Sequence, residues 1–221
     1  MPGSSLWLLP PPAHPVRTAL STLIASTLPA ALPAEAGVIF EPHMTLTSDI
    51  PAEAYGEGPQ GWLDAIPWPA APACDGVRVR FAGVASQDVF VRRCYIQVHA
   101  GQGGVRDLVG FARAHAVYGE EDASGPETRA WLQRWEAAYG PHVSLIYGNV
   151  PMDEAKLREV TRLVGEAGIR LNPSGETLKT AAVESEAEGE GRWDGWEGGV
   201  LWLVPTDKPI AEWKPIATRV I

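Results

Sequence analysis

The segment PHMTL at residues 42–46 is repeated in altered form as PHVSL at residues 141–145, about a hundred residues further along a chain of 221. Both copies have the pattern Pro-His-apolar-hydroxyl-Leu. Alternate residues of a β-strand point to the same face of the sheet. If both copies are strands, each places an imidazole beside a hydroxyl, while Met44 or Val143 points to the opposite face, into a core.

The rest of the chain alternates between strand and helix patterns. Further runs of β-branched and aromatic residues predict strands over 5–9, 38–40, 77–84, 89–98, 177–183 and 200–204. Helices are predicted to open at Pro15, Val105 and Asp153, and after a capping box that starts at Ser124. A regular βαβ order is missing, so the sequence predicts an α+β fold with antiparallel sheet.

The charge balance narrows the classes of partner. Lys and Arg number 18 against 27 Asp and Glu, for a net charge of −9. Residues 184–199 alone hold six carboxylates, one arginine and several glycines, a composition typical of a solvated acidic loop. Binding of a nucleic-acid polymer needs a basic face, so no such partner is expected, whereas a small anionic substrate remains compatible with the sequence.

Targeting signals and cysteine motifs are not found in the sequence. No apolar run is long enough to cross a membrane, and the first residues lack the pattern of a signal peptide. We therefore expect a cytoplasmic protein without a membrane partner. The two cysteines form no CxxC motif, which argues against a disulfide framework and against a structural zinc site.

The two repeated segments would form a complete set of acid–base groups if their strands lay together. A neutral imidazole can remove a proton from water, and a protonated one can give a proton to a leaving alkoxide. Imidazole suits both tasks because its ordinary pKa is about 6.5. His43 and His142 are therefore the candidate catalytic residues, and the hydroxyls of Thr45 and Ser144 are candidate ligands for phosphate oxygens. Because a hydroxyl is a poor zinc ligand, no metal or other cofactor is expected.

The duplicated His-x-Thr/Ser pattern resembles the two-histidine phosphoesterase superfamily, and its flanks resemble the cyclic phosphodiesterases of fungi and plants. The resemblance implies one pseudo-symmetric, two-lobed domain over residues 1–221, with antiparallel sheets around a central cleft and helices outside. It implies metal-independent hydrolysis of 2',3'-cyclic nucleotides to 2'-phosphates, and of ADP-ribose 1'',2''-cyclic phosphate to ADP-ribose 1''-phosphate. In this comparison Tyr147 matches an aromatic residue that contacts substrate.

Two other functions are compatible with the same motifs. An enzyme that joins or cleaves RNA ends through 2'-5' linkages would share them but should carry a basic rim, and a non-catalytic nucleotide-binding module would not need both histidines and both hydroxyls intact. We expect a monomer that acts on a small cyclic phosphate nucleotide. Association with the Golgi, as in fungal relatives, is the other location that the resemblance implies.

Other residues of interest have simpler expected roles. Three histidines without a repeated hydroxyl neighbour are expected to be structural or superficial: His14, His99 and His115. One of three tryptophans could stack on a base, and the sequence does not choose among them: Trp7, Trp62 and Trp68. Arg92 and Arg93 alternate on a predicted strand, so at most one should face the cleft, and solvent or an ion pair is the expected environment.

Overall fold

The computed structural model describes residues 3–68, 77–101, 104–174 and 193–221. Eight strands form an antiparallel sheet in the order β6-β3-β4-β5-β2-β1-β7-β8. The strands are β1 (Ser4–Leu9), β2 (Met44–Ile50), β3 (Arg78–Ala85), β4 (Cys94–Val98), β5 (His142–Ile146), β6 (Gly195–Glu197), β7 (Val200–Pro205) and β8 (Ala217–Val220). The predicted α+β class is confirmed.

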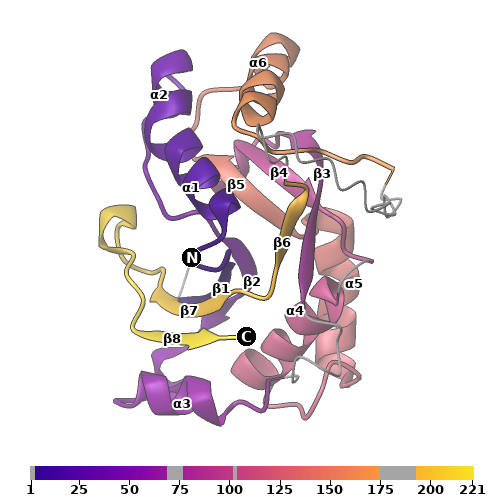
Figure 1. Ribbon diagram of the computed structural model, residues 1–221. Helices are drawn as coiled ribbons and strands as arrows, with labels where there is room; N and C mark the ends of the chain where they lie inside the picture. The colour runs from indigo at the N-terminus through magenta and orange to yellow at the C-terminus, as the bar shows by residue number, and fades with distance from the viewer. Residues whose placement is uncertain (1–2, 69–76, 102–103, 175–192) are drawn as a thin grey trace.

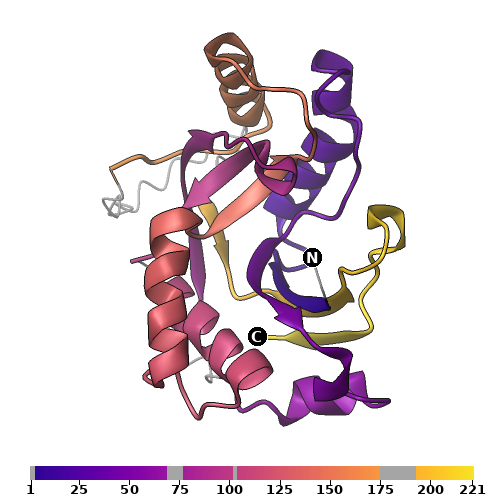
Figure 2. The same cartoon turned by 180° about the vertical axis from the view of Figure 1, so that it is seen from behind.

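The helices lie around the outside of this sheet (Figures 1 and 2). They are α1 (Pro15–Thr22), which continues through the π-helical turn η1 (Leu23–Thr27) into α2 (Leu28–Ala31), α3 (Pro59–Ala65), α4 (Val105–Arg113) with the π-helical turn η4 (Ala114–Tyr118), α5 (Pro126–Ala138) and α6 (Glu154–Glu166). The 3-10 turns are η2 (Ala52–Ala54), η3 (Phe90–Arg92) and η5 (Ile210–Glu212). In both views α1, α2 and α6 gather at one end of the sheet, and α3 lies at the other.

The two repeated segments meet at the centre of the sheet. β2 and β5 are neighbours, and Met44 pairs with Val143. Outward from this pair, the strands β2-β1-β7-β8 on one side match β5-β4-β3-β6 on the other. The strand order is therefore matched on the two sides of the central pair within one continuous sheet.

One face of the sheet packs into the hydrophobic core. From the repeated segments Met44, Leu46, Val143 and Leu145 are buried in this core together with residues of α1, α4 and α6. The opposite face, which carries the residues between these apolar positions, is called the site face below. The alternation that the repeated segments predicted is thus confirmed.

A register shift interrupts both central strands at the same place. In β2 the partners of Trp7 and Leu6 are Thr45 and Thr47, which leaves Leu46 as an extra residue. In β5 the partners of Tyr95 and Cys94 are Ser144 and Ile146, which leaves Leu145 extra. Such a bulge reverses the alternation of side chains beyond it. Each bulge begins three residues after the histidine of its motif.

Local structure departs from the sequence predictions at three places. Residues 38–40 are not a strand, and the strand predicted over 89–98 begins only at Cys94 because η3 precedes it. Ser124 does not cap α5, because the carboxylate of Glu120 reaches from upstream and accepts hydrogen bonds from the backbone of Glu127 and Thr128. A charged acceptor with two oxygens serves two free amides at the helix start.

Part of the predicted acidic loop is a strand. β6 lies within 184–199 because Trp196 is buried there and pairs with Val79 of β3. Residues 184–192, the predicted strand over 177–183 and Cys74 lie outside the described residues. Within the described parts of the chain, none of the helices has the length and apolar character needed to cross a membrane.

A buried arginine ties α4 to the bulged strand β2. The Arg113 guanidinium donates to the Thr47 hydroxyl at 3.2 Å, to the Ser48 carbonyl at 2.9 Å and to the Tyr118 hydroxyl at 3.2 Å. It also lies over the ring of Trp131, 4.8 Å from the ring centre. The bulge places Thr47 on the core face, where this charge-assisted network provides its partner.

Replacement of Arg113 should therefore destabilise the fold. Arg113→Met removes the donor to three oxygens, and we expect the free energy of unfolding to fall by about 1–3 kcal/mol in urea denaturation. The matched control is Arg158→Met, which breaks only an exposed pair with Glu154 and should change stability by less than about 0.5 kcal/mol. Equal stability of the two variants would contradict a structural role of Arg113.

Candidate active site

Both predicted catalytic histidines lie at the centre of the site face. His43 comes directly before β2 and His142 is the first residue of β5. The pair Met44–Val143 fixes the antiparallel register, so position 43 lies across from Ser144 and position 45 lies across from His142. The imidazole of each motif is therefore placed beside the hydroxyl of the other motif.

Each imidazole is held by the same backbone contact. Nδ1 of His43 lies 2.6 Å from the carbonyl oxygen of Glu41, and Nδ1 of His142 lies 3.0 Å from that of Gly140. A carbonyl only accepts hydrogen bonds, so Nδ1 carries the proton in both rings. In the neutral form Nε2 is then the basic atom, and this is the atom that can take a proton from, or return one to, a reacting group.

Burial strongly favours the neutral form of both rings. Desolvation and, to a smaller extent, the neighbouring His142 lower the pKa of His43 to about 4, although the Glu41 hydrogen bond acts in the opposite direction. Desolvation and the positive charge of Arg92 lower the pKa of His142 to about 4, against the hydrogen bond to Gly140. An anion placed between the rings would favour the imidazolium form and raise both pKa values.

Aromatic rings enclose His43. The indole of Trp7 stacks on the imidazole with ring centres 3.7 Å apart and planes 12° apart. The ring of Phe40 meets the imidazole edge-on at 6.2 Å. The Tyr147 hydroxyl lies 3.5 Å from Nε2 of His43. The side chain of His43 is only 4% exposed, so its orientation is determined by packing on all sides.

The bulge in β5 explains how Tyr147 reaches this site. In a regular strand a residue five positions after His142 would point into the core, but the extra residue Leu145 reverses the alternation. The Tyr147 ring instead stacks on Phe40 at 3.8 Å on the site face. Burial raises the pKa of its phenol, and a hydrogen bond with Ser144 opposes that rise only in part. The phenol is therefore a neutral donor beside both motifs.

The two candidate phosphate ligands differ in their surroundings. The Ser144 hydroxyl is buried and donates to the Val91 carbonyl at 2.9 Å. Thr45 is half-buried, and its hydroxyl has no hydrogen-bond partner within the described ranges. Thr45 is thus the hydroxyl that is ready to donate to a bound oxyanion, whereas Ser144 would have to rotate away from Val91.

The three tryptophans proposed for base stacking have other roles. Trp7 is buried under His43. Trp62 contacts Tyr55 edge-on at 6.0 Å, and Trp68 is buried, donating from its indole to the Leu63 carbonyl. None of them offers a free ring at the site.

Sequence reasoning missed three aromatic residues of the site: Phe40, Tyr95 and Trp213. Tyr95 pairs with Ser144 across β4 and β5, and its ring lies 5.2 Å from that of His142. Trp213 follows η5 and touches both Trp7 and Tyr147 edge-on, at 5.7 and 6.2 Å. The alternation of β4 could have indicated Tyr95, but Phe40 and Trp213 lie outside strands, where no periodicity indicates a direction.

The predictions for the three other histidines and for two arginines have different outcomes. His14 caps α1, His99 lies 2.7 Å from the Asn172 carbonyl and His115 packs on Phe111, so their structural roles are confirmed. The prediction for Arg92 and Arg93 was wrong about the strand, but the expected ion pair is found for Arg93, which lies 2.9 Å from the Asp88 carboxylate. Neither lies on a strand, and both are buried, because η3 turns them inward against backbone carbonyls.

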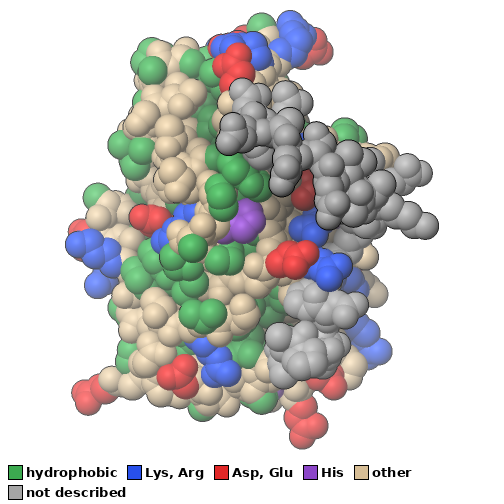
Figure 3. Space-filling model, viewed as in Figure 1, with side chains coloured by type: hydrophobic (Ala, Val, Ile, Leu, Met, Phe, Trp, Pro, Cys, Tyr) green, Lys and Arg blue, Asp and Glu red, His purple; other side chains and the backbone are tan. Residues whose placement is uncertain are grey.

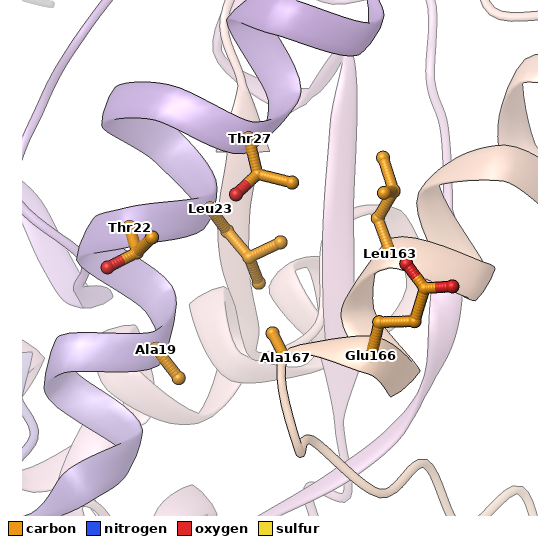
Figure 4. A pocket seen from close by; sticks show the side chains of 7 residues that line it. All are labelled: Ala19, Thr22, Leu23, Thr27, Leu163, Glu166 and Ala167. Carbon is orange, nitrogen blue, oxygen red and sulfur yellow. The ribbon is translucent and has the colours of Figure 1, made fainter.

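Two further views show a surface of the molecule and a pocket. Figure 3 shows a histidine side chain near the centre of one face, with hydrophobic side chains gathered around it. A separate pocket of about 310 Å³ lies between α1, η1 and α6 (Figure 4). It is lined by Ala19, Thr22, Leu23, Thr27, Leu163, Glu166 and Ala167 and contains none of the site residues.

The arrangement provides acid–base chemistry on a small group bound between the rings. Carbonyls bind Nδ1 of both rings and leave both Nε2 atoms for proton transfer, while Thr45 lies across from His142 and the Tyr147 hydroxyl lies 3.5 Å from Nε2 of His43. Among the described residues, no three His, Cys, Asp or Glu side chains gather as a metal site would require. The geometry therefore favours proton transfer between the two imidazoles and a bound oxyanion.

Comparison with known proteins agrees with this chemistry. A family model described as "Cyclic phosphodiesterase-like protein" matches residues 1–221. A relative named "2',3'-cyclic-nucleotide 3'-phosphodiesterase" from Neurospora crassa is 49% identical, over 100% of both chains. A relative of the same name from Phaeosphaeria nodorum is 37% identical over 99% of each chain, and one from Yarrowia lipolytica is 27% identical over 98% of this chain and 99% of its own. This chain belongs to the family of cyclic phosphodiesterase-like proteins.

Proposed function

We propose that this protein hydrolyses nucleoside 2',3'-cyclic phosphates to nucleoside 2'-phosphates. The observation that carries the proposal is the matched pair His43 and His142, each with its Nδ1 proton engaged by a backbone carbonyl, which leaves Nε2 as the atom available for proton transfer. The names of the relatives support this substrate class, and the full-length match to the family supports an enzyme of the same kind.

The reaction needs one neutral and one protonated imidazole. Nε2 of the neutral ring takes a proton from water as the water oxygen attacks phosphorus. The bond between phosphorus and the 3' oxygen breaks, and the protonated ring gives its proton to that oxygen. The products are a 2'-phosphate and a free 3'-hydroxyl, and the enzyme has exchanged which ring holds the proton. Each acid–base group typically contributes ~10²–10⁴-fold to the rate.

Hydroxyl groups complete the proposed site. The Thr45 hydroxyl, which lies across from His142, donates to a non-bridging oxygen of the phosphate. Ser144 and Tyr147 bind the opposite side of the same group, beside His43. ADP-ribose 1'',2''-cyclic phosphate contains the same strained ring and is proposed as a second substrate. The phosphodiester chemistry uses side chains alone, and the substrate is a small molecule rather than a nucleic-acid polymer.

A product assay tests the proposed function. Purified protein is incubated with 2',3'-cyclic AMP or with ADP-ribose 1'',2''-cyclic phosphate in the presence of EDTA, and the products are separated by chromatography. We expect the nucleoside 2'-phosphate and ADP-ribose 1''-phosphate, at rates unchanged by chelation. Formation of a 3'-phosphate, or activity that returns only with a divalent ion, would contradict the proposal.

Matched variants show whether the activity belongs to this site. His43→Ala and His142→Ala should each reduce kcat by ~10²–10⁴-fold while the protein stays folded. His14→Ala is the control, because His14 caps α1 and lies outside the site. A histidine variant of the site that retained wild-type turnover would exclude the paired mechanism.

The Thr45 hydroxyl should matter through its ability to donate. Thr45→Val keeps the shape but removes a hydrogen bond to a charged oxygen, which is worth about 1.5–3 kcal/mol, so kcat/KM should fall roughly tenfold or more. Thr45→Ser keeps the donor and should retain most of the activity. Steady-state kinetics of the two variants on one substrate make the comparison, and equal values would show that this hydroxyl does not contact phosphate.

The pH dependence of kcat/KM should have its maximum on the acid side of 6.5. Both histidines of the free enzyme have pKa values lowered to about 4, so the form with one proton shared between them becomes rarer as the pH rises above that value. The apparent pKa values read from the pH profile belong to the two histidines together and are not assigned to either one. Bound phosphate raises both pKa values, so the maximum of kcat should lie at higher pH than that of kcat/KM. A kcat/KM that rises steadily from pH 5 to pH 9 would contradict this reading.

A further inference from the structure

Arg92 lies beside His142, although it is not part of either repeated motif. Arg92 is the last residue of η3, two positions before the first residue of β4, and it is only 2% exposed. Its guanidinium carbon lies 4.6 Å from the ring centre of Tyr95, and the Tyr95 ring in turn lies 5.2 Å from that of His142. A fixed positive charge is therefore buried one aromatic ring away from a catalytic imidazole.

The guanidinium also holds the backbone that leads into His142. Its two terminal nitrogens donate to the carbonyls of Ala138, at 3.3 Å, and Tyr139, at 2.6 Å. These carbonyls are at the C-terminal end of α5, where they lack helical partners and where the helix dipole favours a cation. The next residue, Gly140, is the one whose carbonyl binds Nδ1 of His142. Arg92 thus fixes the turn that sets the tautomer of this histidine.

Among the described residues, no Arg or Lys acts on the pKa of His43 as Arg92 acts on that of His142. His43 instead rests on the indole face of Trp7, and the π face of a tryptophan favours a positively charged ring. In the described structure three charged or titratable groups act on or contact His142. They are Arg92 from η3, Tyr95 from β4 and His43, which precedes the neighbouring strand β2. Tyr139, at the end of α5, faces Arg92 rather than the imidazole. The two histidines of the repeated motifs therefore differ in their electrostatic surroundings: a guanidinium acts on His142, and an aromatic face contacts His43.

We propose that Arg92 is a positioning residue for His142. It holds the 138–140 turn so that Nδ1 keeps the proton, and its charge disfavours the imidazolium form, so that Nε2 of His142 is free to accept a proton. The use of this basic atom in phosphodiester hydrolysis rests on the proposed function. The tautomer and the proton affinity of His142 do not, and they can be measured without any substrate.

The test is a titration of the histidine side chains by nitrogen-15 NMR. In Arg92→Met the pKa of His142 should rise by roughly one unit, and its Nδ1-protonated tautomer should lose population, while His43 changes little. Arg92→Lys retains a positive charge without the fork that reaches two carbonyls. In Arg92→Lys the retained charge should keep the pKa of His142 closer to its value in the wild type. The loss of the contacts with two carbonyls should still reduce the population of the Nδ1-protonated tautomer. His14 in each spectrum is an internal reference.

The controls separate positioning from mere stability. Arg113→Met also removes a buried arginine that binds backbone and rings, but it lies on the core face, against Thr47 and Ser48 of β2, and it should leave the pKa and tautomer of His142 unchanged. If Arg92→Met does not fold, Arg92→Gln is titrated in its place. An unchanged pKa and tautomer of His142 in the Arg92 variants would overturn the proposal. A shifted His142 in a protein without activity on cyclic nucleotides would instead overturn only the proposed function.

Discussion

The pairing of Met44 with Val143 is the contact on which the rest of the site depends. It joins the two halves of the sheet, buries both side chains in one core and aligns the strands antiparallel. In this alignment the polar neighbours of each apolar residue turn to the same face, so two short motifs that are far apart in sequence become one constellation. A slip by one residue would turn the histidine of one motif into the core.

The same local device is used twice and with different results. Each half carries one extra leucine three residues after its histidine. In β2 the resulting reversal sends Thr47 to Arg113, which anchors α4 to the strand. In β5 it sends Tyr147 to the site face, beside His43. The bulge in β2 therefore stabilises the fold, whereas the bulge in β5 adds a side chain to the site. The two halves also differ in charge, because Arg92 acts on His142.

The sequence predicted the features that depend on neighbouring residues, and it missed those that depend on contacts between distant segments. The repeated Pro-His-apolar-hydroxyl-Leu pattern correctly predicted that Met44 and Val143 are buried and that His43 and His142 share a face, because alternation is a property of every strand. The conformation of η3 depends on contacts with β5 and the end of α5, so the pattern over 89–98 was misread as a continuous strand, and solvent or an ion pair was expected around Arg92 where backbone carbonyls surround it. Phe40 and Trp213 approach the site from segments without periodicity. Their positions come from packing on Tyr147 and Trp7, which local sequence does not encode.

The burial of two neutral imidazoles also has a thermodynamic consequence for the whole protein. An unfolded histidine binds a proton near pH 6.5, whereas these two do so only near pH 4 in the folded chain. Between these values the unfolded state holds more protons than the native state, so the free energy of unfolding falls as the pH falls through this window. At neutral pH both states are unprotonated at these positions and the penalty vanishes. The burial of these two rings therefore makes the folded protein less stable at acid pH.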